Sequence, residues 1–139
     1  MAISHQGVFV QTPKITPITI VPADTTTKKT VATAGANGSK VIGLSISSDD
    51  TAARVLQIWL TRAAVSYLLA TIDIPALAGF DGIVPVVNAM NSTEWPGLPV
   101  DNDGQTYFFL ESGDTLQIAT TATITAAKTI YGKTIFGDF

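Results

Sequence analysis

The sequence contains few of the side chains from which most active sites are built. Its 139 residues include no cysteine, one histidine and two glutamates, and charged residues make up only 14% of the chain. Without cysteine the chain forms neither disulfides nor thiolate metal sites, and general acid–base catalysis lacks its commonest side chains. We therefore expect a structural or binding protein that has no catalytic residue, no cofactor and no metal ion.

Long runs of basic or apolar residues are also missing. The eight basic residues are scattered, Lys28 and Lys29 are the only adjacent pair, and the net charge is −3. Proteins that track phosphates carry clustered basic side chains, so no nucleic-acid partner is expected. Residues 1–14 do not have the pattern of a secretory signal, and no stretch reaches the roughly eighteen apolar residues of a membrane span. No membrane partner is expected either.

Threonine, by contrast, is abundant, with twenty copies that often alternate with valine, isoleucine and leucine. β-branched residues are enriched in strands, and alternation places every second side chain on one face. The alternation is clearest in residues 40–47, 54–62 and 115–125. The apolar positions expected to form the inner faces of a sandwich are Ile42, Leu44, Ile46, Leu56, Ile58, Leu60, Leu116 and Ile118.

Less regular strands are expected between these segments and turns. They cover residues 15–21, which suit an edge strand, and residues 27–34, 67–74, 106–111 and 128–136. Roughly seven or eight strands with almost no helix predict an all-β protein, an antiparallel β-sandwich with jelly-roll-like connectivity. At this chain length, residues 15–139 are expected to form a single domain.

Two segments do not follow the strand pattern. Residues 1–14 are expected to form an extended N-terminal arm, because Pro13 and then Pro17 and Pro22 remove backbone donors and resist regular central pairing. Residues 75–105 are interrupted by glycine and proline and form a long excursion, in which residues 85–90 favour a short helical turn. Long excursions in compact domains usually carry an interface or a binding role.

Three groups of residues invite a chemical interpretation, and each has a simpler one. Residues 101–105 resemble part of a calcium-binding loop, but the register of that loop would place Pro99 and Leu110 at ligand positions, so we predict a tight turn. A glycosidase would have to pair Glu94 with Glu111, and these acids are expected to be solvated. A catalytic triad would have to use His5, which we predict to be a solvent or interface residue, and no Gly-x-Ser-x-Gly motif is present.

The aromatic residues Trp59, Tyr67, Trp95 and Tyr131 could stack on sugars, as in carbohydrate-binding sandwiches. A contact within the core or between subunits is favoured, because Trp59 lies opposite the face of Leu56 and Ile58 and extends the apolar surface outward.

Two segments carry a resemblance to a known class of protein. They are SDDTAARVLQIWL at residues 48–60 and LPVDNDGQTYFFLESGDTLQI at residues 98–118. With them, the chain resembles small structural proteins of tailed-bacteriophage virions, especially the decoration or cement proteins of the head. The resemblance implies a β-sandwich that forms homo-oligomers, with a trimer favoured, and binds the major capsid protein or another virion protein. It also implies a location in the virion, assembled in the host cytoplasm.

Two alternatives remain open at this point. A tail or baseplate component would share most of these features, and a carbohydrate-binding module would share the sandwich. The candidate interface residues are apolar or aromatic residues of the arm, the second strand face, the excursion and the last strand. They are Val8, Phe9, Val10, Val55, Trp59, Trp95 and Tyr131.

Overall fold

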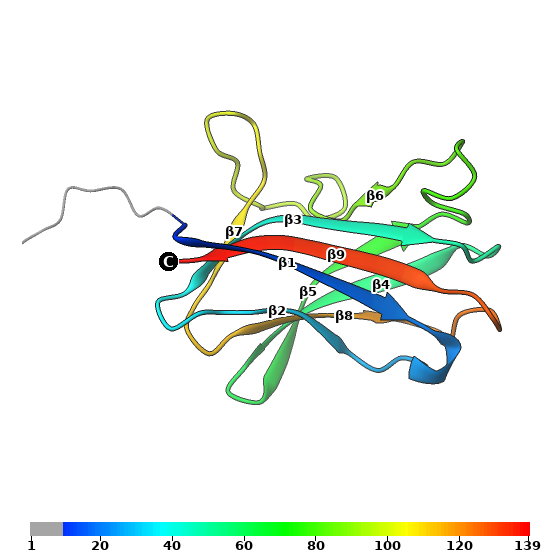
Figure 1. Cartoon of the computed structure of the whole chain (residues 1–139), viewed down its shortest axis with the longest axis horizontal. Coiled ribbons are helices and arrows are strands. Elements are labelled where there is room, and N and C mark those ends of the chain that lie inside the picture. The colour runs from blue at the N-terminus through cyan, green and yellow to red at the C-terminus, as the bar shows by residue number, and fades with distance from the viewer. Residues whose placement is uncertain (1–9) are drawn as a thin grey trace, which may run out of the picture.

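The chain folds into two antiparallel β-sheets that pack face to face (Figure 1). The computed structural model describes residues 10–139. One sheet has the order β1-β9-β3-β6, with β7 also paired to β3, and the second has the order β2-β8-β4-β5. The predicted all-β class and antiparallel β-sandwich are confirmed. The strands are β1 (Thr12–Ile20), β2 (Lys29–Thr33), β3 (Ser39–Ser48), β4 (Arg54–Arg62), β5 (Val65–Ile74), β6 (Val87–Asn88), β7 (Phe108–Leu110), β8 (Thr115–Thr120) and β9 (Ile130–Asp138).

Helical structure is limited in the described residues. A single 3-10 turn, η1 (Pro22–Asp24), follows β1. The Asp24 carboxylate accepts a hydrogen bond of 2.8 Å from the Val21 backbone N–H. It also forms an ion pair with the Lys29 ammonium at 2.8 Å. Residues 10–139 contain no helix with the length and apolar character needed to cross a membrane.

The core lies between the sheets and is built from the inward-facing positions of the central strands. Six of the eight predicted inner residues are at most 1% exposed, which confirms their assignment. They are Leu44, Ile46, Leu56, Ile58, Leu116 and Ile118. A seventh, Leu60, is half-buried near the end of β4 and packs against this core.

The prediction for the eighth residue, Ile42, is wrong. The pairing of β3 with β9 shifts register between Val41 and Gly43, which marks a β-bulge. A bulge adds one residue to one strand, so the alternation resumes with the opposite parity. Ile42 is consequently 37% exposed, and Val41, which is fully buried, takes the inward position.

β8 ends earlier than the alternating pattern predicted. The pattern predicted a strand over residues 115–125, but β8 ends at Thr120. Thr125 instead binds the carboxylate of Asp50, through its backbone N–H at 3.0 Å and its hydroxyl at 2.7 Å. These hydrogen bonds hold Thr125 at Asp50, and the last five residues of the pattern lie outside β8.

The boundary of the arm also differs from the prediction. β1 begins at Thr12 and pairs with β9 along its whole length, so residues 12–14 belong to the sheet. Val10 precedes the strand, and its side chain packs over Gly137, where a Cβ atom would collide with it. Residues 1–9, including His5, Val8 and Phe9, lie outside the described part of the chain.

The prolines do not prevent β1 from pairing because β1 is an edge strand. Pro13, Pro17 and Thr19 are separated by even numbers of residues, so their backbone groups point to the same side of the strand. The Thr19 carbonyl points off the sheet, since it accepts a hydrogen bond of 2.6 Å from the Lys29 ammonium of β2. Proline is tolerated where its missing N–H would face away from the neighbouring strand. The edge strand expected at residues 15–21 is therefore confirmed by β1, and its prolines are compatible with pairing on one side only.

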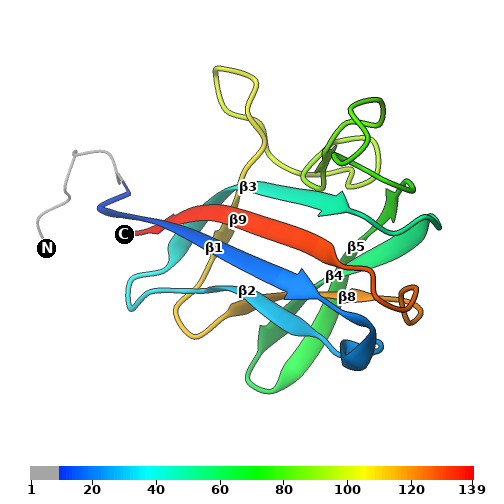
Figure 2. The same cartoon turned by 45° about the vertical axis from the view of Figure 1, so that its right-hand side comes forward.

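The excursion that follows β5 is irregular, but the core anchors it. The helical turn expected at residues 85–90 is wrong, because Val87 and Asn88 form β6 and pair with Ile46 and Ser45 of β3. Three residues of the excursion are at most 1% exposed: Ala78, Ala89 and Met90. Figure 2 shows the excursion on the far side of β3 from β1.

The hairpin of β4 and β5 projects beyond the neighbouring strands (Figure 1). Its two-residue turn consists of Ala63 and Ala64, whose φ angles are 50° and 65°. Turns of this kind favour Asn-Gly, because a Cβ atom is unfavourable at positive φ. The projecting hairpin therefore keeps a strained turn made of small apolar residues.

Replacing both turn residues, as Ala63→Asn with Ala64→Gly, is expected to raise the free energy of unfolding by about 1 kcal/mol, because it removes this strain. Chemical denaturation measures the change. Ala53→Gly is the control, since Ala53 is exposed and is not among the residues with positive φ. The control is expected to lose stability or stay unchanged, and a destabilised Asn-Gly variant would show that the turn carries no strain.

Candidate binding surface

The outer face of the first sheet combines large and small side chains in neighbouring strands. Three outward-facing residues of β9 stand opposite three small residues of β3: Tyr131 opposite Ser47, Lys133 opposite Ser45, and Ile135 opposite Gly43. On the other side of β9, their partners in β1 are Thr19, Pro17 and Ile15. The small residues of β3 leave a depression beside the larger side chains of β9.

Two hollows of about 800 Å³ and about 350 Å³ adjoin on this face. Both are lined by Ser45, Val86 and Lys133, so they join into one continuous depression. We call it the sheet-one groove. Its residues used below are Pro17, Ser45, Ser47, Val86, Tyr131, Lys133 and Ile135.

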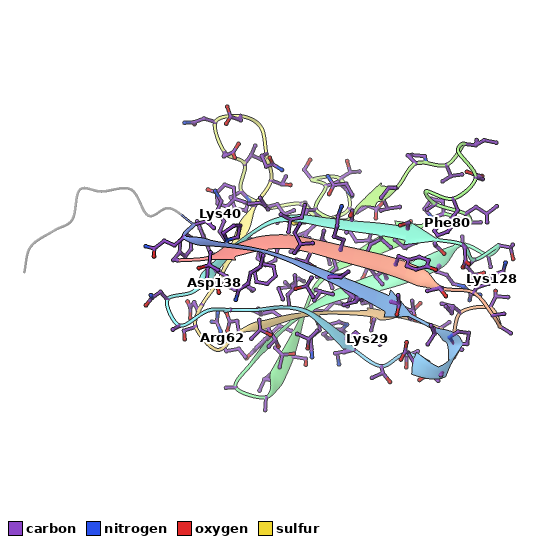
Figure 3. The ribbon with its side chains drawn as sticks, viewed as in Figure 1. Lys29, Lys40, Arg62, Phe80, Lys128 and Asp138 are labelled. Atoms are coloured by element: carbon purple, nitrogen blue, oxygen red, sulfur yellow. The ribbon has the colours of Figure 1, made fainter. Side chains whose placement is uncertain are left out.

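The excursion supplies one wall of the sheet-one groove. Phe80 stacks on Tyr131, with ring centroids 5.5 Å apart and planes inclined by 27°, and Figure 3 labels Phe80 near the end of the sandwich where Lys128 lies. Gly79 has a φ of 78°, and a Cβ atom there would come within 2.8 Å of Val86 and 3.1 Å of Ser47. Only glycine therefore allows the excursion to approach β3 this closely.

Asp81 shapes the tip of this wall. Its carboxylate accepts hydrogen bonds of 2.8 Å from the backbone N–H groups of Ile83 and Val84. These bonds, with that from Val84 the stronger, lower the pKa of Asp81. The tip is therefore a hydrogen-bonded turn, although Ile83 is 85% exposed and Phe80 is 50% exposed.

Lys133 is the charged side chain at the centre of the sheet-one groove. The five ion pairs formed within residues 10–139 do not include it. No residue that lines the two hollows is acidic. A cation in a groove whose lining has no acid attracts a negatively charged partner and repels a basic one.

The predicted interface residues do not share one surface. Tyr131 lies in the sheet-one groove, and Val10 lies beside the start of β1 with 37% of its surface exposed. Val55 and Trp59 are half-buried on the outer face of the second sheet, on the opposite side of the sandwich. If all of these residues contact partners, they do so through two separate surfaces.

The assignment of Trp95 as an interface residue is wrong. Its side chain is 9% exposed and belongs to the core. The ring packs against Phe108 with a centroid separation of 5.2 Å. Trp95 therefore anchors the excursion to the sandwich, and it is not available to a partner.

The four aromatic residues considered for sugar stacking do not form a shared platform. The Lys28 ammonium lies 4.3 Å from the ring centroid of Trp59 and covers it. Trp95 is buried, Tyr131 already stacks on a ring of the excursion, and Tyr67 lies in the projecting hairpin. A sugar platform needs exposed ring faces, which disfavours the carbohydrate-binding alternative.

The two glutamates lie too far apart for glycoside hydrolysis. Glu94 accepts a hydrogen bond of 2.8 Å from the Asp73 N–H, and Glu111 lies 3.4 Å from the Arg62 guanidinium. Asp73 pairs with Val55, seven residues before Arg62 in β4. At about 3.3 Å per residue these points are roughly 20 Å apart, whereas a catalytic pair is separated by about 5 to 9.5 Å.

The turn predicted at residues 101–105 is confirmed. The Asp101 carboxylate accepts hydrogen bonds of 2.9 Å from the backbone N–H groups of Asp103 and Gln105. Gly104 has a φ of 83°, as the turn requires. Among the described residues, no group of three or more histidine, aspartate or glutamate side chains is arranged to hold a metal ion.

No family model and no curated protein matches this chain. The sheet-one groove contains residues that the sequence did not single out, above all Lys133, Phe80 and Val86. The outward position of Lys133 follows from the alternation of Tyr131, Lys133 and Ile135, which is visible in the sequence. Phe80 and Val86 lie in the irregular excursion, whose path no periodic pattern describes.

Proposed function

We propose that the protein is a non-enzymatic virion structural protein that binds and stabilises a bacteriophage capsid as a homo-oligomer. The observation that carries the proposal is the sheet-one groove. It is partly apolar, its lining includes two lysines, Lys29 and Lys133, and no lining residue is acidic. Such a surface suits a broad contact with a neighbouring protein better than the enclosure of a small substrate.

The position of the groove supports this proposal. β1, which follows the predicted arm, forms one edge of the first sheet, and β6 within the excursion lies at the other end. The two segments expected to grip a larger assembly therefore flank the same face. Chain segments that are far apart in sequence but border one groove can hold a partner from both sides.

The strand order gives further support. Successive strands alternate between the sheets with two exceptions: β4 and β5 both belong to the second sheet, and β6 and β7 both belong to the first. The last strand inserts between β1 and β3. We take this order as support for a jelly-roll-like connectivity, which remains a proposal; jelly rolls occur among viral capsid domains. A tail or baseplate component would use the same surface, and the choice of assembly in a binding experiment distinguishes the two.

Charge reversal at the centre of the groove tests the proposal. Lys133→Glu is expected to weaken binding to capsid shells that lack the protein by tenfold or more, about 1.4 kcal/mol. Lys28→Glu is the matched control, because Lys28 is also exposed but lies near Trp59 on the second sheet. A co-sedimentation titration measures both dissociation constants.

Three outcomes of this titration would count against the proposal. Wild-type protein that does not bind shells but binds isolated tails would favour the tail alternative. Binding to neither assembly would remove the structural role. Binding that Lys28→Glu weakens more than Lys133→Glu would move the contact to the face that carries Trp59.

A further inference from the structure

β5 is a free edge of the second sheet and carries exposed apolar side chains. It is ten residues long and pairs only with β4 along one side. Three of its residues near the hairpin turn are about half exposed: Val65 (50%), Tyr67 (52%) and Leu68 (49%). This part of the strand also projects from the sandwich (Figure 1). An edge of this kind is a template for pairing with another strand.

The other sheet edges of the described chain are protected. β1 has Pro13 and Pro17 at positions that point off the sheet. β2 has five residues, contains a bulge, and carries Lys29 against β1. β6 and β7 have two and three residues. Short strands, prolines, bulges and lysines are the usual devices against edge pairing, and the first part of β5 has none of them.

The part of β5 that is free to pair is limited along the strand at both ends. At its far end, the Asp73 N–H is occupied by Glu94. A register shift opposite Ile58 and Trp59 leaves Leu69 as a bulge in the middle of the strand. The open segment is therefore residues 65–68, between the turn and the bulge. Residues 65–72 include no charged side chain.

The direction of the backbone groups follows from the hairpin. Arg62 and Val65 close its two-residue turn and face each other across it. In an antiparallel pair, residues alternate between bonding the partner strand and pointing away from it. The backbone N–H and C=O groups of Ser66 and Leu68 consequently point off the sheet and are available to a new strand.

We propose that a second copy of this chain occupies this edge, with β5 pairing antiparallel to β5 of the partner about a two-fold axis. Ser66 of each copy then faces Leu68 of the other, and Tyr67 faces its own counterpart. The pairing covers Val65, Tyr67 and Leu68 and places no like charges opposite each other. It joins the two second sheets into one continuous sheet across the dimer.

The base of the hairpin is held in place for this pairing. The Arg62 guanidinium donates two hydrogen bonds of 2.7 Å to the carboxylate of Asp114, which is 1% exposed. This paired contact fixes the hairpin relative to β8. A two-fold contact gives a dimer, in place of the trimer implied by the resemblance, and it leaves the sheet-one groove on the other sheet free.

Light scattering combined with size-exclusion chromatography, at high micromolar concentration, tests the pairing. The wild-type protein is expected to have twice the mass of one chain. Tyr67→Lys, which places two like charges opposite each other, is expected to raise the dimer dissociation constant at least tenfold. Val100→Lys is the control, because Val100 is 53% exposed, close to the value for Tyr67, and lies in the excursion. The control is expected to remain a dimer.

A cysteine variant keeps the test decisive if Tyr67→Lys does not fold. The chain has no cysteine, so Tyr67→Cys introduces a single thiol per copy. Residues opposite each other at a non-hydrogen-bonded position have Cα atoms about 4.5 Å apart, close enough for a disulfide. Mild oxidation is expected to link Tyr67→Cys much faster than Val100→Cys. A wild-type monomer or trimer, or equal rates for the two cysteine variants, would overturn the proposal. Shell binding is measured separately through Lys133, so either proposal can fail alone.

Discussion

Replacing Ile46 by alanine is expected to lower the free energy of unfolding by about 2 to 5 kcal/mol, because the change leaves a cavity in the core. Replacing Ile42 by alanine is expected to change it by about 0.5 kcal/mol or little more. The two residues are isoleucines of the same strand, four positions apart, and simple alternation assigns them to the same face. Ile46 is fully buried and Ile42 is 37% exposed.

Urea denaturation of the two variants measures this difference directly. The comparison is well matched, because the residue type, the strand and the substitution are the same. Equal losses for both variants would mean that β3 continues without the bulge at Val41–Gly43. The register of the first sheet, and with it the position of the sheet-one groove, would then need to be revised.

The second large effect is expected at Asp50, which is fully buried after β3. One carboxylate oxygen accepts hydrogen bonds from the Ala52 N–H at 3.0 Å and the Thr125 hydroxyl at 2.7 Å. The other accepts from the Arg54 guanidinium at 2.8 Å and the Thr125 N–H at 3.0 Å. This one side chain therefore connects the loop before β4 to the segment after β8.

Asp50→Asn is expected to cost about 3 kcal/mol or more at neutral pH, because an amide cannot accept all four bonds and Arg54 loses its charge partner. Asp103→Asn is the control, since Asp103 is exposed and its side chain accepts none of the hydrogen bonds found in the loop. The control is expected to change stability by about 0.5 kcal/mol or less. A comparably small loss for Asp50→Asn would show that the cluster does not hold these segments together.

The same substitution is expected to change how stability depends on pH. Burial alone would raise the pKa of Asp50, but the hydrogen bonds from Thr125, Ala52 and Arg54 outweigh it and hold the pKa far below its usual 3.8. A carboxyl with a lowered folded-state pKa adds stability that is complete above the unfolded-state pKa and is lost as pH falls below it. The wild-type protein should therefore lose stability below about pH 4, and Asp50→Asn should lose less. Parallel curves for the two proteins would contradict this assignment.

The central strands could be predicted from the sequence because their side chains alternate between a core and an outer face. Leu56 and Ile58 in β4, and Leu116 and Ile118 in β8, follow this rule without interruption. The rule fails at Ile42 because a bulge depends on how β3 meets β9, which the pattern of one strand does not contain. It fails after Thr120, where Thr125 is hydrogen-bonded to Asp50, a residue 75 positions away that the pattern of one strand does not contain.

The candidate surface could be predicted only in part. The outward positions of Tyr131 and Lys133 follow from the alternation of β9, but their neighbours Phe80 and Val86 arrive through the irregular excursion. The burial of Trp95 could not be predicted from its sequence neighbours. Its contact with Phe108 joins two segments that no common hydrophobic periodicity connects. The prolines of β1 indicated an edge strand in the sequence, and at positions that face off the sheet they protect this edge.

Hydroxyl-radical footprinting of the wild-type protein, free and bound to capsid shells, tests the proposed role of the sheet-one groove most directly. The oxidation rates of Tyr131 and Phe80 are expected to fall on the shell, because both rings would be covered by the capsid. The rate of Tyr67 is expected to stay the same, since the partner copy already covers it in the free dimer. Unchanged rates at Tyr131 and Phe80, together with protection of Trp59 or Tyr67 on the shell, would contradict the proposed surface.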